Sequence, residues 1–279
     1  MSGILYVVGT PIGNLNDFSS RGLETLQSVD FIAAEDTRVT LKLLNRFDIK
    51  KPLVSYHEHN RFEKGSMIVD RILAGENCAL VTDAGMPAIS DPGEELVLQC
   101  HLAGVTVASV PGPSALITAL AISGMPSGRF TFEGFLSMNK KNRRDHLEQL
   151  INESRTMIFY EAPHKLLSTL KDLQQALGNR ELALVRELTK IHEEVLRTTL
   201  EDAIAYYEQQ PPKGEFVLIV RGREDKPSDA PAYTLEQAAQ LARKLMEQGE
   251  APTKAAKEAA QVTGFKKNDI YACLTRVKE

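Results

Sequence analysis

Carboxylates, glycines and prolines gather in one short segment, residues 81–93, with the sequence VTDAGMPAISDPG. It continues an apolar run and then carries two glycines, two prolines, Asp83 and Asp91 within a dozen residues. The glycines permit backbone angles that other residues avoid, and the prolines fix φ and remove two donors. This composition predicts a stiff ligand-binding loop at the carboxyl end of a strand, where open α/β sheets bind ligands. A surface turn is the alternative, although a plain turn needs fewer such residues.

Four further segments rich in glycine, proline or charge follow apolar runs in the same way. They are residues 9–14 (GTPIGN), 35–38 (EDTR), 111–115 (PGPSA) and 160–164 (YEAPH). If the strands before them are parallel, all five loops open at one edge of their sheet, and this convergence predicts a cleft. The first of these loops matches neither GxGxxG nor a P-loop, so the dinucleotide and nucleoside triphosphate fingerprints are absent from it.

The elements that must position these loops alternate between apolar strands and helices, which predicts an α/β fold with a largely parallel sheet covered by helices. A cluster of glycines and a proline at 124–128 predicts a domain boundary. We therefore expect two α/β domains, residues 1–123 and 124–223, with a ligand cleft between them. A charged, proline-bearing linker at 224–232 precedes a C-terminal helical module, residues 233–279, in which Thr234 and Gln237 form a capping-box pattern that predicts a helix start. Its last two helices have helix–turn–helix spacing, which small bundles also produce without touching nucleic acid.

Composition narrows the class of protein. The chain has 279 residues, of which 43% are hydrophobic and 25% charged, as in globular proteins of about two domains. The three cysteines are odd in number and widely spaced, so we expect no disulfide framework, no zinc site and a cytoplasmic location. No signal peptide is expected at the N-terminus. Residues 105–128 are uncharged and long enough to imitate a membrane span, but prolines and glycines interrupt them. They predict a strand, a loop and a core helix, and no membrane partner.

Eight motifs occur in an order that is familiar: TPIGNL, AAEDTR, DAGMPAISDPG, PGPSA, EGFL, FYEAPHKL, REL-K and GEFVLIV. From about Ile4 to the C-terminus, the chain resembles the bacterial small-subunit rRNA (cytidine-2′-O)-methyltransferases, a branch of the tetrapyrrole methylase superfamily. The resemblance implies S-adenosylmethionine as methyl donor, bound between two α/β domains, and a homodimer. It also implies small-subunit rRNA, free or in the assembled subunit, as the acceptor, methylated on a cytidine ribose in the decoding region.

The resemblance also assigns cofactor contacts. Carried onto this sequence, they are Pro11, Gly85, Met86, Pro87, Ile89, Ser114, Ala115, Tyr160, Glu161, Leu188 and Gly214. The wider superfamily often has Gly-Asp-Pro where this chain has Gly85-Met86-Pro87, and Asp83 just upstream is the candidate replacement. This departure counts against a tetrapyrrole substrate.

Methyl transfer from a sulfonium to a ribose oxygen needs no metal, but the hydroxyl must lose its proton or be strongly hydrogen-bonded. Glu35, Asp36 and Asp83 are the candidate catalytic groups, with Glu161 as a further candidate. Arg38 is a candidate for bidentate binding of the target phosphate. The alternative for Glu35, Asp36 and Arg38 is a helix N-terminus with favourable acids and a local ion pair.

A basic cluster follows the first strand of the second half and precedes a pattern that predicts a helix over residues 145–153. Lys140, Lys141, Arg143 and Arg144, less Asp145, give a local charge of +3, and such patches bind phosphates. We expect these four residues to bind RNA from a loop, with a solvated basic loop as the alternative.

Two rival functions remain at this stage: a tetrapyrrole C-methyltransferase of the same fold, and a non-catalytic RNA- or nucleotide-binding protein. His57 and His59 alternate as metal ligands do, but no third ligand is evident and we expect loop residues.

Overall fold

The computed structural model describes residues 2–224 and 233–275. The chain divides into two compact units, residues 1–223 and 224–279. The first unit contains both sheets, and the division predicted within it, after residue 123, stays a prediction. Most of the predicted linker, residues 225–232, and the last four residues of the predicted helical module lie outside the described residues.

The first sheet is entirely parallel, as the alternating pattern predicted. Its strand order is β3-β2-β4-β1-β5. The strands are β1 (Ile4–Val8), β2 (Phe31–Ala34), β3 (Leu53–Ser55), β4 (Cys78–Val81) and β5 (Thr106–Val110). The helices around it are the short 3-10 helix η1 (Leu15–Asp17), α1 (Ser20–Ser28), α2 (Thr37–Arg46), α3 (Arg61–Leu73) and α4 (Glu94–Leu102).

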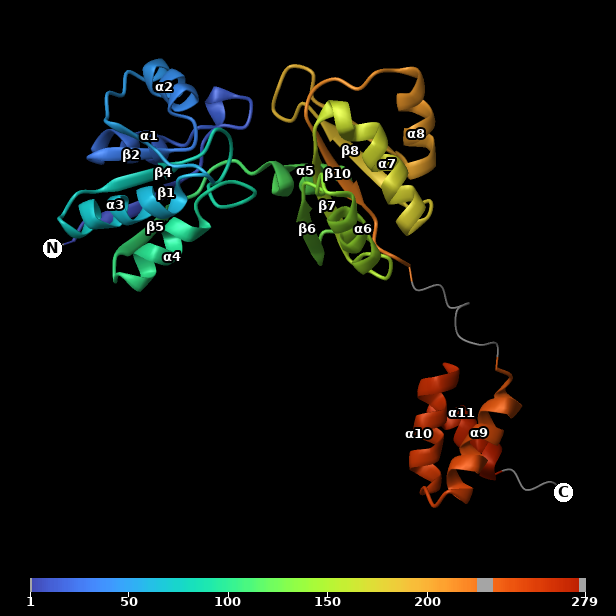
Figure 1. Cartoon of the computed structure of the whole chain (residues 1–279). Coiled ribbons are helices and arrows are strands. Elements are labelled where there is room, and N and C mark those ends of the chain that lie inside the picture. The colour runs from blue at the N-terminus through green and yellow to red at the C-terminus, as the bar shows by residue number, and fades with distance from the viewer. Residues whose placement is uncertain (1, 225–232, 276–279) are drawn as a thin grey trace. The chain divides into compact units, whose positions relative to one another are not determined.

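Helices cover both faces of this sheet (Figure 1). Alternate residues of a strand face opposite sides, so neighbours in β2 enter different cores. Phe31 packs in one core with residues of α3 and α4, including Ile68 and Leu96. Ile32 packs in the other with Leu26 of α1 and Leu44 of α2. The loops that follow the strands are therefore held at one edge by a sheet that is buried on both sides.

The second sheet is mixed, and here the prediction of a largely parallel sheet is wrong. Its order is β6-β7-β10-β8-β9, and only the β6–β7 pair is parallel. Its strands are β6 (Phe130–Gly134), β7 (Thr156–Glu161), β8 (Glu181–Arg186), β9 (Glu194–Thr199) and β10 (Phe216–Val220). A short connection joins β8 to β9 as an antiparallel pair, and β10 enters between β7 and β8. The apolar residues of a strand do not indicate whether its neighbours in the sheet run parallel or antiparallel to it, so the sequence could not predict these directions.

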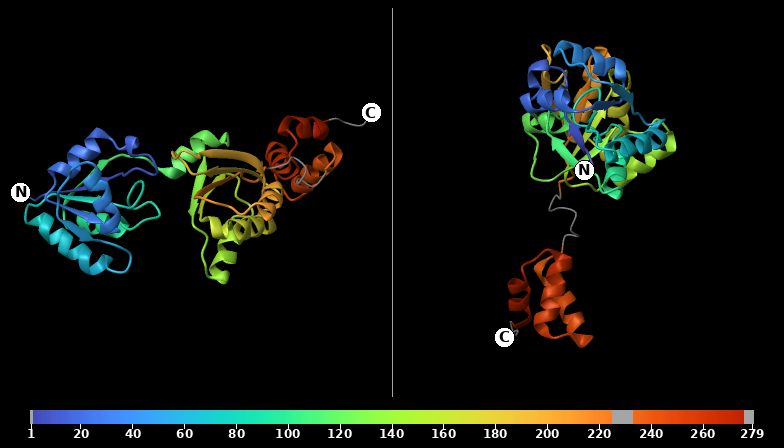
Figure 2. Two further views of the ribbon diagram at one scale, coloured as in Figure 1. Left: turned by 90° about the horizontal axis from the view of Figure 1, so that it is seen from above. Right: turned by 90° about the vertical axis from the view of Figure 1, so that its left-hand side faces the viewer.

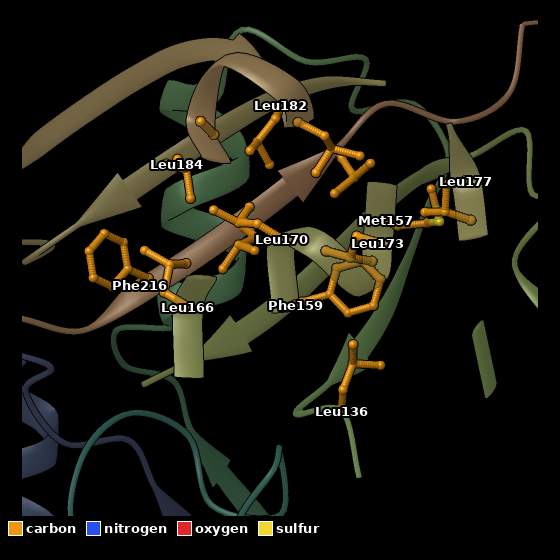
Figure 3. Close-up of a cluster of buried hydrophobic side chains, with 14 of the residues drawn as sticks. Leu136, Met157, Phe159, Leu166, Leu170, Leu173, Leu177, Leu182, Leu184 and Phe216 are labelled. Carbon is orange, nitrogen blue, oxygen red and sulfur yellow. The ribbon is translucent and has the colours of Figure 1, made fainter. Parts of the chain in front are cut away.

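Two layers of helix cover the second sheet. On one face, α5 (Ala115–Ser123) places Leu116 and Leu120 against Ile158 and Val217. On the other face lie α6 (Lys140–Gln149), α7 (Pro163–Leu177) and α8 (Leu200–Gln209). Figure 3 shows part of the core beneath them, where leucines of α7 and Phe159 of β7 belong to one buried cluster. The uncharged stretch 105–128 thus forms a strand, a loop and a core helix, as predicted.

The basic cluster lies on a helix, so the predicted basic loop is wrong. The sequence pattern predicted a helix over 145–153, whereas α6 begins at Lys140 and ends at Gln149. The side chain of Asn139 accepts hydrogen bonds from the backbone N–H groups of Lys141 and Asn142, which satisfies two donors of the first turn. This cap allows the helix to start five residues earlier than its apolar residues suggest.

The second unit contains α9 (Leu235–Glu247), α10 (Pro252–Thr263) and α11 (Lys267–Thr275), seen again in Figure 2. Thr234 and Gln237 form the predicted capping box at the start of α9. The core of this unit is small and consists of Ala238, Ala242, Ala255, Ala256, Ala259 and Ile270. Among the helices of residues 2–224 and 233–275, none is both long and apolar enough to cross a membrane.

Candidate functional site

A cavity of about 510 Å³ opens at the carboxyl edge of the first sheet and is walled on its other side by the second sheet. All five loops singled out in the sequence contribute to it. The predicted site residues that line it are Glu35, Asp83, Gly85, Met86, Ile89, Ser114, Ala115, Tyr160, Glu161 and Leu188. The volume is in the range of small-molecule sites.

Carboxylates form one side of the cavity. The hydroxyl of Thr82 donates to Oε2 of Glu35 at 2.6 Å, and the backbone N–H of Asp36 donates to Oδ1 of Asp83 at 3.2 Å. Burial and the nearby Glu35 raise the pKa of Asp83. The same two causes raise the pKa of Asp91 to about 6. Like charges thus gather where solvent is partly excluded, an arrangement that favours binding a cation or holding a proton.

Asp36 and Arg38 lie beside the cavity and do not line it. Asp36 caps α2 by accepting from the backbone N–H of Arg38 at 2.8 Å. Its carboxylate also pairs with the guanidinium of Arg38, with oxygen–nitrogen distances of 3.0 and 2.6 Å. These bonds hold the pKa of Asp36 well below its usual range. Asp36 and Arg38 thus form a helix cap and a local ion pair, which is the alternative to a functional role that the sequence also allowed. The side chain of Arg38 is nevertheless 86% exposed.

Glu161 and Tyr160 attach the cavity wall to neighbouring helices. Glu161 is buried and accepts from the backbone N–H of Ala162 at 2.9 Å and from the hydroxyl of Thr169 at 2.5 Å. The hydroxyl oxygen of Tyr160 accepts from the backbone N–H of Leu116 at 3.0 Å. This bond satisfies one of the free donors at the start of α5. Burial raises the pKa of Tyr160.

The first loop is pinned to the central loop by backbone contacts. Thr10 and Gly85 exchange two backbone hydrogen bonds, of 2.9 and 3.1 Å. A Cβ atom on Gly9 would lie 2.6 Å from the sulfur of Met86 and 2.7 Å from Cα of Gly112, so three loops pass too closely for any side chain there. Pro11 follows Gly9 and Thr10 in the chain and does not line the cavity, whereas its neighbour Ile12 does.

Strained backbone is concentrated around the cavity. Ala88 and Ser90 have φ of 69° and 65°, and Glu187 and Thr189, on either side of Leu188, have φ of 51° and 65°. Four of the five non-glycine residues with positive φ in the described chain therefore lie in two loops that line the cavity. Such strain persists where surrounding structure imposes it, and it clusters at ligand sites.

Like Pro11, two further predicted cofactor contacts, Pro87 and Gly214, do not line the cavity. Gly214 has φ of +84°, and a Cβ atom there would lie 2.6 Å from Cγ of Glu187. Its lack of a side chain lets the Glu187 carboxylate accept from the backbone N–H of Glu215 at 3.0 Å. Gly214 thus supports the strained loop that carries Leu188.

The basic residues of α6 divide into two kinds. Lys140, Lys141 and Arg144 are exposed, and in the part of the chain that the structure describes neither lysine has a carboxylate partner. Arg143 has only 15% of its side chain exposed. It donates to Asp172 at 2.6 Å and to the hydroxyl of Thr169 at 2.8 Å. None of the four lines the cavity.

Sequence reasoning missed several residues that line the cavity: Ile12, Ser90, Asp91, Phe135, Val185, Glu215 and Val217. Asp91 belongs to the VTDAGMPAISDPG segment, and the many glycines, prolines and aspartates of that segment were the signal that could have identified it. Phe135 stands in the EGFL motif. Within residues 2–224 and 233–275, no group of three or more His, Cys, Asp or Glu side chains could hold a metal ion. The cysteines Cys78, Cys100 and Cys273 are free.

Comparisons with known proteins agree with this architecture. Residues 4–204 match the family of tetrapyrrole (corrin/porphyrin) methylases. A Synechocystis protein named ribosomal RNA small subunit methyltransferase I is 49% identical over 270 residues, 96% of each chain. A Thermotoga maritima protein of the same name is 48% identical over 222 residues, 80% of this chain and 100% of that protein.

A solved structure of diphthine synthase superposes with a TM-score of 0.61 at 16% identity, covering 79% of this chain and 90% of that one. At that identity the likeness concerns the fold alone. The family match covers most of the chain, and the Synechocystis relative spans nearly its whole length. The chain therefore belongs to the tetrapyrrole methylase family, in the branch of the small-subunit methyltransferase I proteins.

Proposed function

We propose that this protein transfers a methyl group from S-adenosylmethionine to the ribose 2′-hydroxyl of a cytidine in the decoding region of small-subunit rRNA. The observation that carries the proposal is the cavity at the carboxyl edge of the first sheet, which is lined by carboxylates and by apolar and aromatic side chains. It occurs in a chain that shares 49% identity with a protein named as an rRNA small-subunit methyltransferase.

The residues of the cavity fit S-adenosylmethionine. Ile12, Met86 and Leu188 offer apolar contact, and Asp83 and Asp91 offer negative charge to a sulfonium. Pro11, Pro87 and Gly214 would act through the backbone of the loops to which they belong. When bound, the donor supplies an electrophilic methyl group, and the chain's own residues supply alignment and proton transfer.

The acceptor hydroxyl must give up its proton as its oxygen bonds to the methyl carbon. A carboxylate of the Glu35, Asp83 and Asp91 cluster is positioned to take that proton. We assign it first to Asp91, which lines the cavity and whose pKa, raised to about 6, leaves it ionised yet still basic at pH 7. Asp36, held ionised by Arg38, is better suited to fixing the start of α2.

The remaining assignments follow from the proposed acceptor. Lys140, Lys141 and Arg144 would bind rRNA phosphates, and Arg38 would bind the phosphate nearest the target. The acceptor is rRNA or the assembled small subunit, which implies a cytoplasmic protein. We propose a homodimer on the strength of the family resemblance.

The decisive experiment uses small subunits from a strain that lacks this gene. Labelled S-adenosylmethionine is supplied with wild-type protein, and the product is mapped by its resistance to alkaline cleavage. One 2′-O-methylated cytidine is expected. Asp91→Asn should lower kcat about 10²-fold or more, because the general base is lost. Asp70→Asn, an exposed residue of α3, is the control.

Label in neither naked rRNA nor subunits, with donor binding intact, would contradict the proposal and direct the search to small-molecule acceptors. Label on a base carbon or nitrogen would retain rRNA as the acceptor and exclude the ribose. Full activity of Asp91→Asn would shift the proton acceptor to Glu35 or Asp83.

A further inference from the structure

Phe135 is an exposed aromatic residue in the wall of the cavity. The residue keeps 57% of its surface exposed, and it also lines the cavity. The other aromatic residues that line the cavity are less exposed, since Phe216 keeps only 2% of its surface and Tyr160 is partly buried. A single exposed apolar residue needs no explanation. The backbone that carries Phe135, however, departs from a regular strand, and this departure needs an explanation.

A bulge turns Phe135 toward the cavity. The pairing register of β6 and β7 shifts between Phe132 and Gly134, and Gly134 has φ of +62°. Residues three apart in a regular strand point to opposite faces. Here both Phe132 and Phe135 contact the ring of Tyr160, with centroid distances of 5.0 and 5.6 Å. Bulges beside active sites commonly redirect a side chain in this way.

The ring against which Phe135 rests is fixed. Tyr160 accepts the hydrogen bond from Leu116 at 3.0 Å, and Phe132 meets its ring at an interplanar angle of 68°. Phe135 contacts the same ring edge to face, at 63°. The next residue, Leu136, is buried in the core of the second sheet. Phe135 is thus held between anchored neighbours while most of its surface stays open.

The neighbours of Phe135 supply the chemistry that flanks a base in a nucleotide. A Cβ atom on Gly134 would lie 3.5 Å from the hydroxyl of Ser90, so the bulge passes next to the loop that carries Asp91. In the other direction, Lys140 and Lys141 follow within six residues, on the first turn of α6. A carboxylate, an aromatic ring and two cations therefore adjoin one short segment.

We propose that Phe135 is the platform on which the base of the acceptor nucleotide stacks once it leaves its RNA helix. The inference rests on the proposed function and deepens it, by naming how the acceptor is held. Enzymes that act on a nucleotide within a helix must extrude it, and aromatic side chains commonly receive the extruded base. The adenine of S-adenosylmethionine is also a flat aromatic base, so it is the competing candidate for stacking on Phe135. The exposure of Phe135, together with the two lysines that follow it within six residues of the chain, assigns it to the acceptor.

The test compares three substitutions in the full-length protein: Phe135→Ala, Phe135→Leu and Phe135→Trp. Stacking on an aromatic side chain contributes about 5- to 150-fold in affinity per base. Phe135→Ala should raise KM for small subunits by about tenfold or more and leave the Kd for S-adenosylmethionine within about twofold of wild type. Phe135→Leu keeps an apolar side chain and should share the defect, whereas Phe135→Trp should restore KM.

Phe62→Ala is the matched control, since Phe62 is 63% exposed on α3 and does not line the cavity. A weaker donor Kd with unchanged acceptor KM would overturn the inference and give the ring to the donor. Wild-type KM in Phe135→Leu would reduce the role to apolar packing and also overturn it. Failure of the proposed function is distinct, because wild type and the Phe62→Ala control would then leave subunits unmethylated as well.

Discussion

Asp91 keeps its proton to a higher pH than an ordinary surface aspartate does. The pKa of a free aspartate is about 3.9. Burial and the Glu35 carboxylate raise that of Asp91 to about 6 in the folded protein. Between these two values the unfolded chain has released a proton that the folded protein keeps. The folded state therefore loses stability as pH rises from about 4 to 6, and above pH 6 the loss is complete.

Asp91→Asn removes this charge and should make the protein more stable than wild type at pH 7.5. The full shift corresponds to about 3 kcal/mol, and solvent screening at a partly exposed site reduces the expected gain to about 1 kcal/mol. At pH 4 the difference should nearly vanish. Urea unfolding at both pH values measures it. Equal differences at both pH values would show that burial does not penalise this carboxylate.

At the scale of elements, α6 joins the cavity wall to a basic surface. Arg143 crosses from α6 to Asp172 and Thr169 of α7, and Thr169 donates to the cavity residue Glu161. Arg143→Ala should therefore lower the free energy of unfolding by about 1 to 2 kcal/mol, less than for a fully buried pair because Asp172 is 40% exposed. The salt dependence of RNA binding should stay unchanged.

Lys140→Gln combined with Lys141→Gln should leave the stability nearly unchanged and reduce the salt dependence of RNA binding. Stability should change by less than about 0.5 kcal/mol, because both side chains are exposed. The slope of log K against log salt should become shallower by about 1.4, because each lysine that neutralises a phosphate of a single strand accounts for about 0.7. Binding measured across a salt series distinguishes the two variants. A reduced slope in Arg143→Ala would return that residue to the RNA-binding group.

At the scale of the whole molecule, the two compact units have separate cores. The fully buried core of the second unit consists of alanines and one isoleucine, and larger apolar side chains such as Leu241 and Phe265 pack against it while only partly buried. The Thermotoga maritima relative matches over its whole length with only 222 residues. Catalytic capacity is therefore expected to reside in the first unit.

A chain that ends after Glu224 should fold and bind S-adenosylmethionine with about the same Kd as the full chain. The cut keeps Arg223, whose backbone N–H donates to Glu153. Calorimetry should give the shortened chain the main unfolding transition of the full protein. Loss of that transition, or of donor binding, would mean that the second unit contributes to the stability of the first.

The sequence by itself determined what depends on neighbours along the chain. Alternating apolar runs and breakers predicted the five loops and the parallel first sheet, and Thr234 and Gln237 predicted a helix start. These signals are local, because a cap, a turn or a buried strand needs only a few adjacent residues. Seven of the ten predicted site residues that line the cavity follow strands of the first sheet, because parallel strands end at one edge. The other three, Tyr160, Glu161 and Leu188, come from the second sheet and the loop after β8.

Only the tertiary structure decided what depends on distant contacts. The direction of β8, β9 and β10 is set by pairing, not by their own apolar residues. Arg143 and Lys141 look alike in sequence, and packing against α7 buries only the first. The bulge at Gly134 and the left-handed backbone of Ser90 are imposed by surrounding packing, since neither residue type requires them. Those non-local contacts turn Phe135 toward the cavity and raise the pKa of Asp91.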